Sequence, residues 1–245
     1  MDRWVGKVAV VTGASSGIGA ATTKALATAG MVTVGLARRL DRIVALRRDV
    51  PAEAANRLHA IRCDVTIEED IRAAFHEIEK RFGGVDVHIN SAGILRRSVR
   101  LLDANNTQAL RDVVNTNLLG MVLCSREAYL SMKKRSVDGH IVLTNSIVGH
   151  MVPPLNTLNI YTATKHGITA VVETLRHELR LEGSRIKVTS ISPGETNTEM
   201  NPKSEAPNNP MLEPENIADA ILYAIGTPPG MQIQEIIVKP VGEAV

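Results

Sequence analysis

Short apolar runs recur along the chain and alternate with longer stretches whose apolar residues return every three or four positions. The first pattern is typical of strands buried on both faces, and the second of amphipathic helices. The apolar runs predict strands at residues 8–11, 31–36, 58–62, 85–89, 141–144, 186–191 and 233–238. The periodic stretches predict helices at residues 20–29, 41–55, 67–82, 107–134, 161–182 and 214–224, with Pro51 interrupting the second. This alternation, without a hairpin signal, predicts an α/β fold with a doubly wound, mostly parallel seven-stranded sheet in a single domain, residues 1–245.

The amino-acid composition argues against some classes of binding partner. Hydrophobic residues make up 44% of the chain, enough for a sizeable core, whereas aromatic residues make up only 2%. The scarcity of aromatic rings and a formal net charge of only +2 argue against nucleic acid and against an anionic membrane surface as partners. No apolar run is long enough to predict a membrane span, and no signal peptide is recognisable. We therefore expect a cytoplasmic protein.

Neither cysteine nor histidine predicts a metal site. Cys63 and Cys124 lie in separate apolar segments, and the seven histidines are scattered along the chain. Because this spacing matches neither a zinc site nor a disulfide framework, we expect no metal and a reducing compartment.

A glycine-rich turn joins the first predicted strand to the first predicted helix. It reads Thr12-Gly13-Ala14-Ser15-Ser16-Gly17-Ile18-Gly19. Glycines permit close approach of the backbone, and a helix N-terminus offers unpaired N–H groups to a phosphate. The same residues also spell Gly-x-Ser-x-Gly, the nucleophile elbow of serine hydrolases, centred on Ser15. About a dozen residues precede this turn, too few for the strands that supply an oxyanion hole, so we favour the phosphate cradle.

The end of the second predicted strand bears on the choice of dinucleotide. In dinucleotide-binding folds an acidic residue there pairs with the 2′-hydroxyl of NAD, whereas an arginine accommodates the 2′-phosphate of NADP. Arg38 and Arg39 follow the strand directly, and a guanidinium can hold a phosphate through two parallel hydrogen bonds. We therefore expect NADP, while Asp41, slightly farther along, leaves NAD open.

Small and polar residues follow the remaining strands. Asp64 stands just past the third strand, where it can meet an adenine, and Asn90-Ser91-Ala92-Gly93 closes the fourth. Asn145-Ser146 ends the fifth strand, and Pro193-Gly194 ends the sixth. Because ligands bind at the carboxyl ends of strands in open parallel sheets, we expect these residues to share one site.

Tyr161 and Lys165 are four residues apart at the start of a long predicted helix. That spacing places a phenol and an ammonium on one helix face, one turn apart. A nearby positive charge favours the phenolate and lowers a pKa that is otherwise roughly 10. Such a phenol can exchange a proton near neutral pH, so the pair predicts interconversion of an alcohol and a carbonyl. In the predicted helix 107–134, the mid-helix residues Asn115 and Asn117 suggest that one of them has a functional role.

Two loops have an unusual composition. The loop at 147–160 is too apolar for an ordinary surface connection, so we expect a pocket wall. Its apolar residues include Met151, Val152, Leu155, Leu158 and Ile160. The segment at 195–211 is polar, contains three prolines and has no clear period, which suggests a flexible lid.

These motifs together resemble the short-chain dehydrogenase/reductase family over essentially the whole chain. In family order, the matches are Thr12 to Gly19, Asn90-Ser91-Ala92-Gly93, Asn117, Ser146, Tyr161-x-x-x-Lys165 and Pro193-Gly194. The resemblance implies a Rossmann fold, a nicotinamide cofactor and a catalytic set of Asn117, Ser146, Tyr161 and Lys165. Tyr161 would exchange the substrate proton, and Lys165 would lower the pKa of Tyr161 and hold the nicotinamide ribose. Ser146 would hydrogen-bond the substrate oxygen, and Asn117 would position a water.

The cofactor contacts expected from the motifs and the resemblance extend across the chain. Thr198 matches a family position that contacts the carboxamide, and Thr196 would assist it. The full set is Gly13, Ser15, Ser16, Gly17, Ile18, Gly19, Arg38, Arg39, Asp64, Val65, Asn90, Ala92, Gly93, Tyr161, Lys165, Pro193, Gly194, Thr196 and Thr198. The family usually has asparagine where this chain has Ser91, which puts one local hydrogen bond in doubt.

Finer features resemble one subgroup of the family. Ala37-Arg38-Arg39, Arg126-Glu127-Ala128-Tyr129 and Gly149-His150 are similar to insect NADP-dependent alcohol dehydrogenases. The resemblance implies an apolar substrate, farnesol or a related prenyl alcohol. A carbonyl or hydroxysteroid reductase and a non-catalytic NADP-binding sensor are the alternatives. Family members usually pair through their long helices, so we expect a homodimer or homotetramer.

Overall fold

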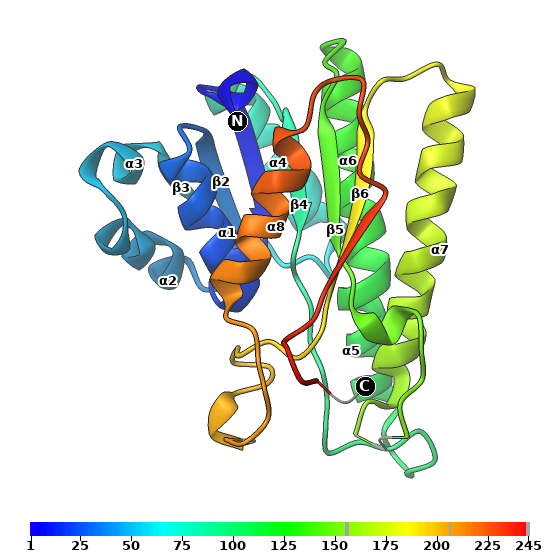
Figure 1. Ribbon diagram of the computed structural model, residues 1–245. Helices are drawn as coiled ribbons and strands as arrows, with labels where there is room; N and C mark the ends of the chain where they lie inside the picture. The colour runs from blue at the N-terminus through cyan, green and yellow to red at the C-terminus, as the bar shows by residue number, and fades with distance from the viewer. Residues whose placement is uncertain (155–156, 206, 244–245) are drawn as a thin grey trace.

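The predicted strands lie together in one parallel sheet (Figure 1). The computed structural model describes residues 1–154, 157–205 and 207–243. The strands are β1 Val8–Thr12, β2 Val32–Ala37, β3 Leu58–Arg62, β4 Val87–Asn90, β5 His140–Thr144, β6 Lys187–Pro193 and β7 Glu235–Val238. They are ordered β3-β2-β1-β4-β5-β6-β7, and each neighbouring pair is parallel. The predicted doubly wound sheet is confirmed.

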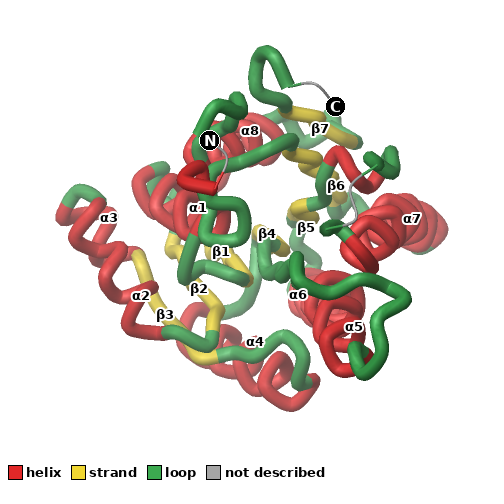
Figure 2. Tube along the Cα trace, turned by 90° about the horizontal axis from the view of Figure 1, so that it is seen from below, coloured by secondary structure: helices red, strands yellow, loops and turns green. Residues whose placement is uncertain are grey.

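Helices cover both faces of this sheet, as parallel strands require. Figure 2 shows α1 and α8 on one face and α4, α6 and α7 on the other. The helices are α1 Gly17–Thr28, α2 Leu40–Ala45, α3 Ala52–Arg57, α4 Glu68–Phe82, α5 Thr107–Val114, α6 Gly120–Lys134, α7 Asn159–Leu181 and α8 Pro214–Gly226. Short 3₁₀ turns lie at Asp2–Trp4, Leu46–Asp49, Ile147–Gly149 and Lys203–Glu205.

Strand β1 explains why the apolar runs lack alternation. Successive side chains of a strand point to opposite faces, and here both faces are covered. Val8 and Val10 pack in the core layer that contains α4, α6 and α7, whereas Ala9 and Val11 pack in the layer that contains α1 and α8. Because each face is buried, every position of the strand is apolar up to Thr12.

Two of the predicted helices are subdivided in the structure. The predicted helix 41–55 consists of α2, a 3₁₀ turn and α3, because Pro51 cannot continue a helix and stands instead as the N-cap of α3. The predicted helix 107–134 is divided by a π-helical turn, Asn115–Leu119, between α5 and α6. Such turns occur often at functional sites, and this one contains Asn117.

The start of α7 lies two residues earlier than predicted, at Asn159. Asn159 has a φ of 40°, in the left-handed region that asparagine tolerates better than most residues. Its side-chain Nδ2 donates to the backbone oxygens of Arg96, at 2.8 Å, and Val99, at 3.0 Å. These bonds join the start of α7 to the loop after β4.

Two properties of the described residues limit the kinds of site. In the ranges 1–154, 157–205 and 207–243, no helix is long and apolar enough to cross a membrane. Those residues also contain no cluster of three or more His, Cys, Asp or Glu side chains that could hold a metal ion.

Candidate active site

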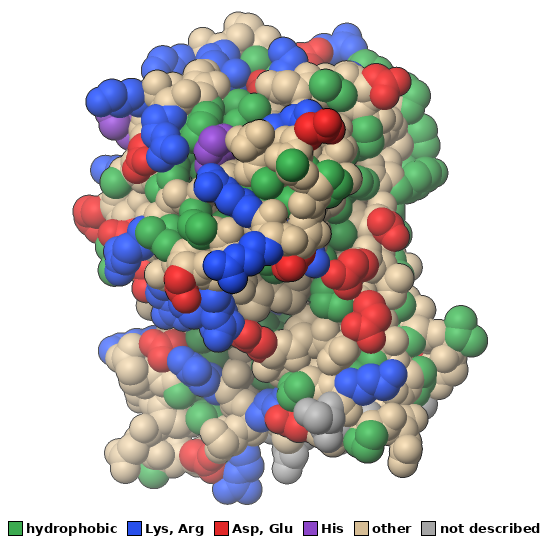
Figure 3. Space-filling view, turned by 90° about the vertical axis from the view of Figure 1, so that its left-hand side faces the viewer, with side chains coloured by type: hydrophobic (Ala, Val, Ile, Leu, Met, Phe, Trp, Pro, Cys, Tyr) green, Lys and Arg blue, Asp and Glu red, His purple; other side chains and the backbone are tan. Residues whose placement is uncertain are grey.

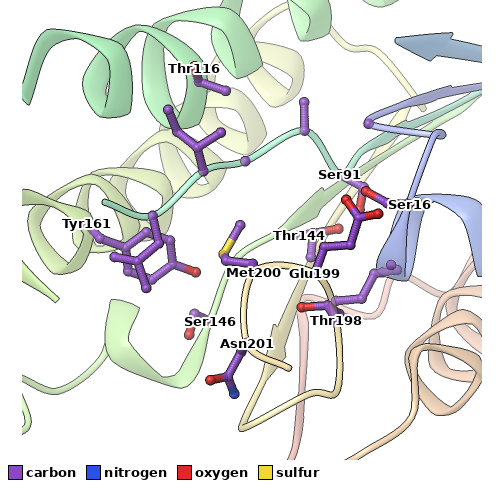
Figure 4. Close-up of a pocket in the computed structure, with 18 of the residues that line it drawn as sticks. Ser16, Ser91, Thr116, Thr144, Ser146, Tyr161, Thr198, Glu199, Met200 and Asn201 are labelled. Atoms are coloured by element: carbon purple, nitrogen blue, oxygen red, sulfur yellow. The ribbon is translucent and has the colours of Figure 1, made fainter. Parts of the chain in front are cut away.

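A cleft of about 720 Å³ opens at the carboxyl ends of the strands. It extends from the glycine-rich turn after β1 to the start of α7, and the segment after β6 covers one side (Figure 4). The predicted site residues that line it are Gly13, Ser15, Ser16, Gly17, Ile18, Gly19, Arg38, Arg39, Asp64, Val65, Ala92, Gly93, Ser146, Tyr161, Lys165, Pro193, Gly194, Thr196 and Thr198. Asn90 and Asn117 do not line this cleft.

The glycine-rich turn packs backbone against backbone. Gly13 has a φ of 70°, and a Cβ there would lie 2.8 Å from the backbone nitrogen of Ala92. A Cβ at Gly19 would lie 2.7 Å from the carbonyl carbon of Gly13. Any side chain at Gly13 or Gly19 would therefore overlap with the backbone atoms packed against it. Since the first N–H groups of a helix lack intrahelical partners, the start of α1 can bind the pyrophosphate of a dinucleotide.

A threonine hydroxyl fixes this turn to the end of β4. Thr12 Oγ1 accepts hydrogen bonds from the backbone N–H groups of Ser91, at 3.1 Å, and Ala92, at 3.2 Å. The backbone amide, not the side chain, makes this bond at position 91. The substitution of serine for the family's usual asparagine therefore leaves the connection between the two strands intact.

Arg39 lies directly over the glycine-rich turn. Its Nη2 donates to Ser15 Oγ, at 3.2 Å, and to Ser16 Oγ, at 3.1 Å. Arg38 instead extends toward Asp64, with Nη1 3.8 Å from Oδ2, and its side chain is mostly exposed. Figure 3 shows Lys and Arg side chains, interspersed with Asp and Glu, on the side of the molecule that carries α2 and α3. Of the two arginines, Arg39 is better placed to meet a phosphate on an adenosine ribose.

The structure brings Tyr161 and Lys165 together on the face of α7 that meets the cleft. Lys165 Nζ lies 5.5 Å from the centre of the Tyr161 ring and donates to the backbone oxygen of Thr144, at 2.8 Å. Lys165 is almost completely buried. The backbone of β5 thus fixes the ammonium one helical turn from the phenol.

Burial dominates the pKa of both groups. It lowers the pKa of Lys165 to about 8. It raises the pKa of Tyr161 to about 12, although hydrogen bonding to Ser146 and the charge of Arg97 act to lower it. This direction for Tyr161 is opposite to the one expected from a neighbouring ammonium, because a buried site disfavours phenolate and ammonium alike. At neutral pH Tyr161 therefore holds its proton.

Ser146 is held between two strand ends. Its hydroxyl donates to the backbone oxygen of Pro193, at 3.4 Å, and accepts from the N–H of Val148, at 3.3 Å. Figure 4 shows Ser146 on the same side of the cleft as Tyr161, with Ser16 on the other side. A hydroxyl group from the turn after β5 and one from α7 thus lie at the end of the cleft remote from the glycine-rich turn.

Asn117 and Asn90 anchor the walls rather than facing the cleft. Asn117 is fully buried, and its Oδ1 accepts from the N–H of Ile94, at 2.8 Å, while Nδ2 donates to the oxygen of Ile94, at 2.9 Å. Asn90 Nδ2 donates to Ser125 Oγ, at 2.8 Å, joining β4 to α6. The structure gives Asn117 a positioning contact with the loop after β4, and its role in holding a water stays a prediction.

The predicted apolar wall forms from part of the loop at 147–160. Ile147, Val148, Pro153 and Leu158 line the cleft. Met151 and Val152 are exposed instead, Val152 at 74%, and Ile160 is not among the lining residues. Leu155 lies outside the described residues. Ile94, Leu95 and Met200 add apolar side chains to the lining of the cleft.

Several lining residues escaped the sequence-based prediction. Arg97 lines the cleft, and its Nη2 donates to Asn201 Oδ1, at 2.5 Å. Glu199 and Glu243 also line it. These polar residues occur in loops without periodicity, so only the path of the folded loops places them. For Glu199 the sequence offered one signal, because the segment 195–211 directly follows the carboxyl end of a strand, where ligands bind in such sheets.

Comparison with known proteins places the chain in a family. The family model described as short chain dehydrogenase matches residues 7–209. A farnesol dehydrogenase of Aedes aegypti is 60% identical over 244 residues, covering 99% of each chain. Dehydrogenase/reductase SDR family member 11 of Homo sapiens is 40% identical, over 98% of this chain and 96% of its own.

Solved structures agree with this placement. An alcohol dehydrogenase from the archaeon Thermococcus sibiricus, complexed with 5-hydroxy-NADP, has a TM-score of 0.83 at 26% identity and covers 98% of both chains. The match of fold, the match of motifs in their order and the full-length relatives all agree. The chain therefore belongs to the short-chain dehydrogenase/reductase family and is an oxidoreductase.

Proposed function

We propose that the protein is an NADP-dependent dehydrogenase that interconverts an apolar alcohol, farnesol or a related prenyl alcohol, and its carbonyl product, with Tyr161 as general acid and base. The observation that carries this proposal is the placement of the Tyr161–Lys165 pair at one end of the cleft whose other end is the glycine-rich turn. A proton donor and a phosphate cradle in one cleft are the two parts that such a reaction needs.

Each side chain has a role that its contacts support. In the reductive direction, Tyr161 would donate its proton to the carbonyl oxygen, and Ser146 would hydrogen-bond the same oxygen. Lys165, fixed by Thr144, would stabilise the phenolate that remains on Tyr161. A nicotinamide, when bound, would supply or accept the hydride. The glycine-rich turn would hold the pyrophosphate of the dinucleotide, with Tyr161 and Lys165 near its nicotinamide ribose.

Arg39 supports NADP over NAD. Its guanidinium lies at the end of β2, where the adenosine ribose of a dinucleotide is bound in this kind of fold. Charged hydrogen bonds to a phosphate contribute about 1.5–3 kcal/mol each, which corresponds to roughly a tenfold preference or more. The complex of the T. sibiricus enzyme with 5-hydroxy-NADP is consistent with this proposal.

The apolar cleft wall and the 60% identity to the A. aegypti farnesol dehydrogenase support a prenyl alcohol. Ile147, Val148 and Leu158 would contact the hydrocarbon tail from one side. A buried methylene group contributes about 0.8 kcal/mol, so a long isoprenoid chain should bind more tightly than a short alcohol.

Turnover with a panel of alcohols tests the proposal. Purified protein would be given farnesol, geraniol, a short aliphatic alcohol or a hydroxysteroid, each with NADP or NAD, and formation of reduced cofactor would be followed by absorbance. Tyr161→Phe removes the hydroxyl, and Tyr223→Phe, on the exposed surface of α8, is the matched control. We expect farnesol turnover with NADP that falls at least 100-fold in Tyr161→Phe, in line with the loss of a general acid.

Other results would redirect the proposal. Turnover of the hydroxysteroid alone would keep the mechanism and make the protein a carbonyl or hydroxysteroid reductase. Binding of NADPH without turnover of any alcohol or carbonyl would favour a sensor. Equal rates for Tyr161→Phe and Tyr223→Phe would refute the role of Tyr161.

A further inference from the structure

A tight turn after β6 presents Glu199 to the glycine-rich end of the cleft. Thr198 and Asn201 are joined by two backbone hydrogen bonds, Thr198 N to Asn201 O at 3.3 Å and Asn201 N to Thr198 O at 3.0 Å. Glu199 and Met200 are therefore the two central residues of a closed turn. Both line the cleft. In Figure 4 Glu199 extends toward the turn that carries Ser16.

Glu199 is paired with two arginines at that end. Its Oε2 accepts hydrogen bonds from Nη1 and Nη2 of Arg39, both at 3.2 Å, and its Oε1 pairs with Nη1 of Arg42. Burial acts to raise the pKa of Glu199, but the hydrogen bond from Arg42 and the charge of Arg39 hold that pKa below its ordinary value. Glu199 is therefore ionised near neutral pH.

The Arg39 guanidinium that Glu199 engages also bridges Ser15 and Ser16. We propose that Glu199 occupies the position of the 2′-phosphate of NADP and competes with it for Arg39. This inference rests on the proposed NADP dependence. A guanidinium donates charged hydrogen bonds to a planar carboxylate and to a tetrahedral phosphate alike, so one oxyanion can replace the other. Two anions cannot share this position without strong repulsion.

The competition gives Glu199 a different effect on each cofactor. A 2′-phosphate must displace the carboxylate before it can pair with Arg39. The 2′-hydroxyl of NAD can instead donate to the carboxylate where it already lies, as acidic residues do in NAD-binding folds. Glu199 is thus a specificity-determining residue that weakens the binding of NADP and leaves the binding of NAD unhindered.

Displacement of Glu199 also reaches the catalytic end of the cleft. Glu199 and Met200 are adjacent in a turn closed by the backbone bonds between Thr198 and Asn201, so a movement of the whole turn that releases Glu199 would also move Met200. Asn201 accepts a hydrogen bond from Arg97, whose charge acts on Tyr161. A 2′-phosphate that displaces the whole turn would therefore shift side chains at the other end of the cleft.

Calorimetry with cofactor fragments tests the competition without catalysis. Adenosine 2′,5′-bisphosphate carries the 2′-phosphate, and 5′-AMP lacks it. Both would be titrated into the wild type, Glu199→Gln and Glu205→Gln, which removes a charge from the same segment away from the cleft. We expect Glu199→Gln to bind the bisphosphate about 3- to 10-fold more tightly, the range that one or two exposed ion pairs supply. Its affinity for 5′-AMP should not increase, and Glu205→Gln should match the wild type.

A fluorescent label tests the movement of the turn. Met200→Cys would be labelled with an environment-sensitive fluorophore, since the native Cys63 and Cys124 are buried. We expect the bisphosphate, but not 5′-AMP, to change its emission, and this difference should vanish when Glu199→Gln is added.

The outcomes separate this inference from the proposed function. Equal affinity of the wild type and Glu199→Gln for the bisphosphate would overturn the competition while leaving NADP dependence intact. Failure of both proteins to prefer the bisphosphate over 5′-AMP would overturn the competition together with NADP dependence. If only Glu199→Gln prefers the bisphosphate over 5′-AMP, the carboxylate of Glu199 blocks the 2′-phosphate in the wild type, which would support the competition.

Discussion

Replacement of Lys165 by methionine should abolish turnover and yet change the pH dependence of stability in a calculable way. The pKa of Lys165 is lowered by burial to about 8, from an ordinary value of 10.5. In the unfolded chain the side chain stays protonated up to its ordinary pKa. Between these two values the unfolded state binds more protons, so stability rises with pH. Methionine is apolar and similar in length, so the variant lacks this titration.

The magnitude follows from the two pKa values. One pKa unit corresponds to about 1.36 kcal/mol, so burying the ammonium costs the folded protein about 3 kcal/mol at pH 7. At pH 9.5 that cost falls to about 1 kcal/mol, because the folded state has mostly released the proton. The wild type should therefore gain about 2 kcal/mol relative to Lys165→Met between the two pH values. Any cost of the substitution that does not depend on pH cancels in this difference.

Urea denaturation of the nucleotide-free proteins at pH 7 and pH 9.5 measures this difference. The higher pH is kept below 10 because the raised pKa of Tyr161 makes the folded state bind more protons than the unfolded state between about pH 10 and pH 12. The buried thiol of Cys63, whose pKa is raised to about 12, titrates alike in both proteins. Lys80→Met, on an exposed part of α4, is the matched control.

Parallel stability profiles for the wild type and Lys165→Met would refute the reasoning. They would mean that Lys165 titrates in the folded protein as it does in water. A wild type that loses stability relative to the variant as pH rises would reverse the sign and point to a stabilised ammonium.

Three further substitutions test separate parts of the site. Gly19→Ala should lower the free energy of unfolding by about 1–3 kcal/mol, because its Cβ would lie against the carbonyl group of Gly13. An unchanged urea midpoint would contradict this packing. Asn117→Ala should cost about 1–3 kcal/mol by leaving the partly buried backbone groups of Ile94 without their side-chain partner. Thermal unfolding measures the loss, and an unchanged Tm would show that Ile94 finds other partners. Arg39→Gln should lower kcat/KM for NADP about 10- to 100-fold and change that for NAD little, through the loss of charged hydrogen bonds. Equal losses with both cofactors would argue against a 2′-phosphate contact.

The sequence alone determined the sheet and the region of the site. Buried parallel strands must be apolar at every position, so runs such as Val8 to Val11 stand out without structural information. The alternation of strands and helices then dictates that the carboxyl ends of the strands meet at one edge. The glycine-rich turn, Ser146 and Tyr161 follow such ends, so their convergence could be predicted from their positions along the chain.

The tertiary structure decided what depends on burial and on the paths of loops. The spacing of Tyr161 and Lys165 gave their proximity, but the pKa of each is governed by desolvation, which arises only when β5 and α7 pack around them. Asn117 stood out as a mid-helix polar residue, yet its contacts with Ile94 depend on a loop from another part of the chain. The pairing of Glu199 with Arg39 joins residues 160 positions apart in the sequence. No local pattern encodes that pairing, because it is set by where an irregular segment returns across the folded sheet.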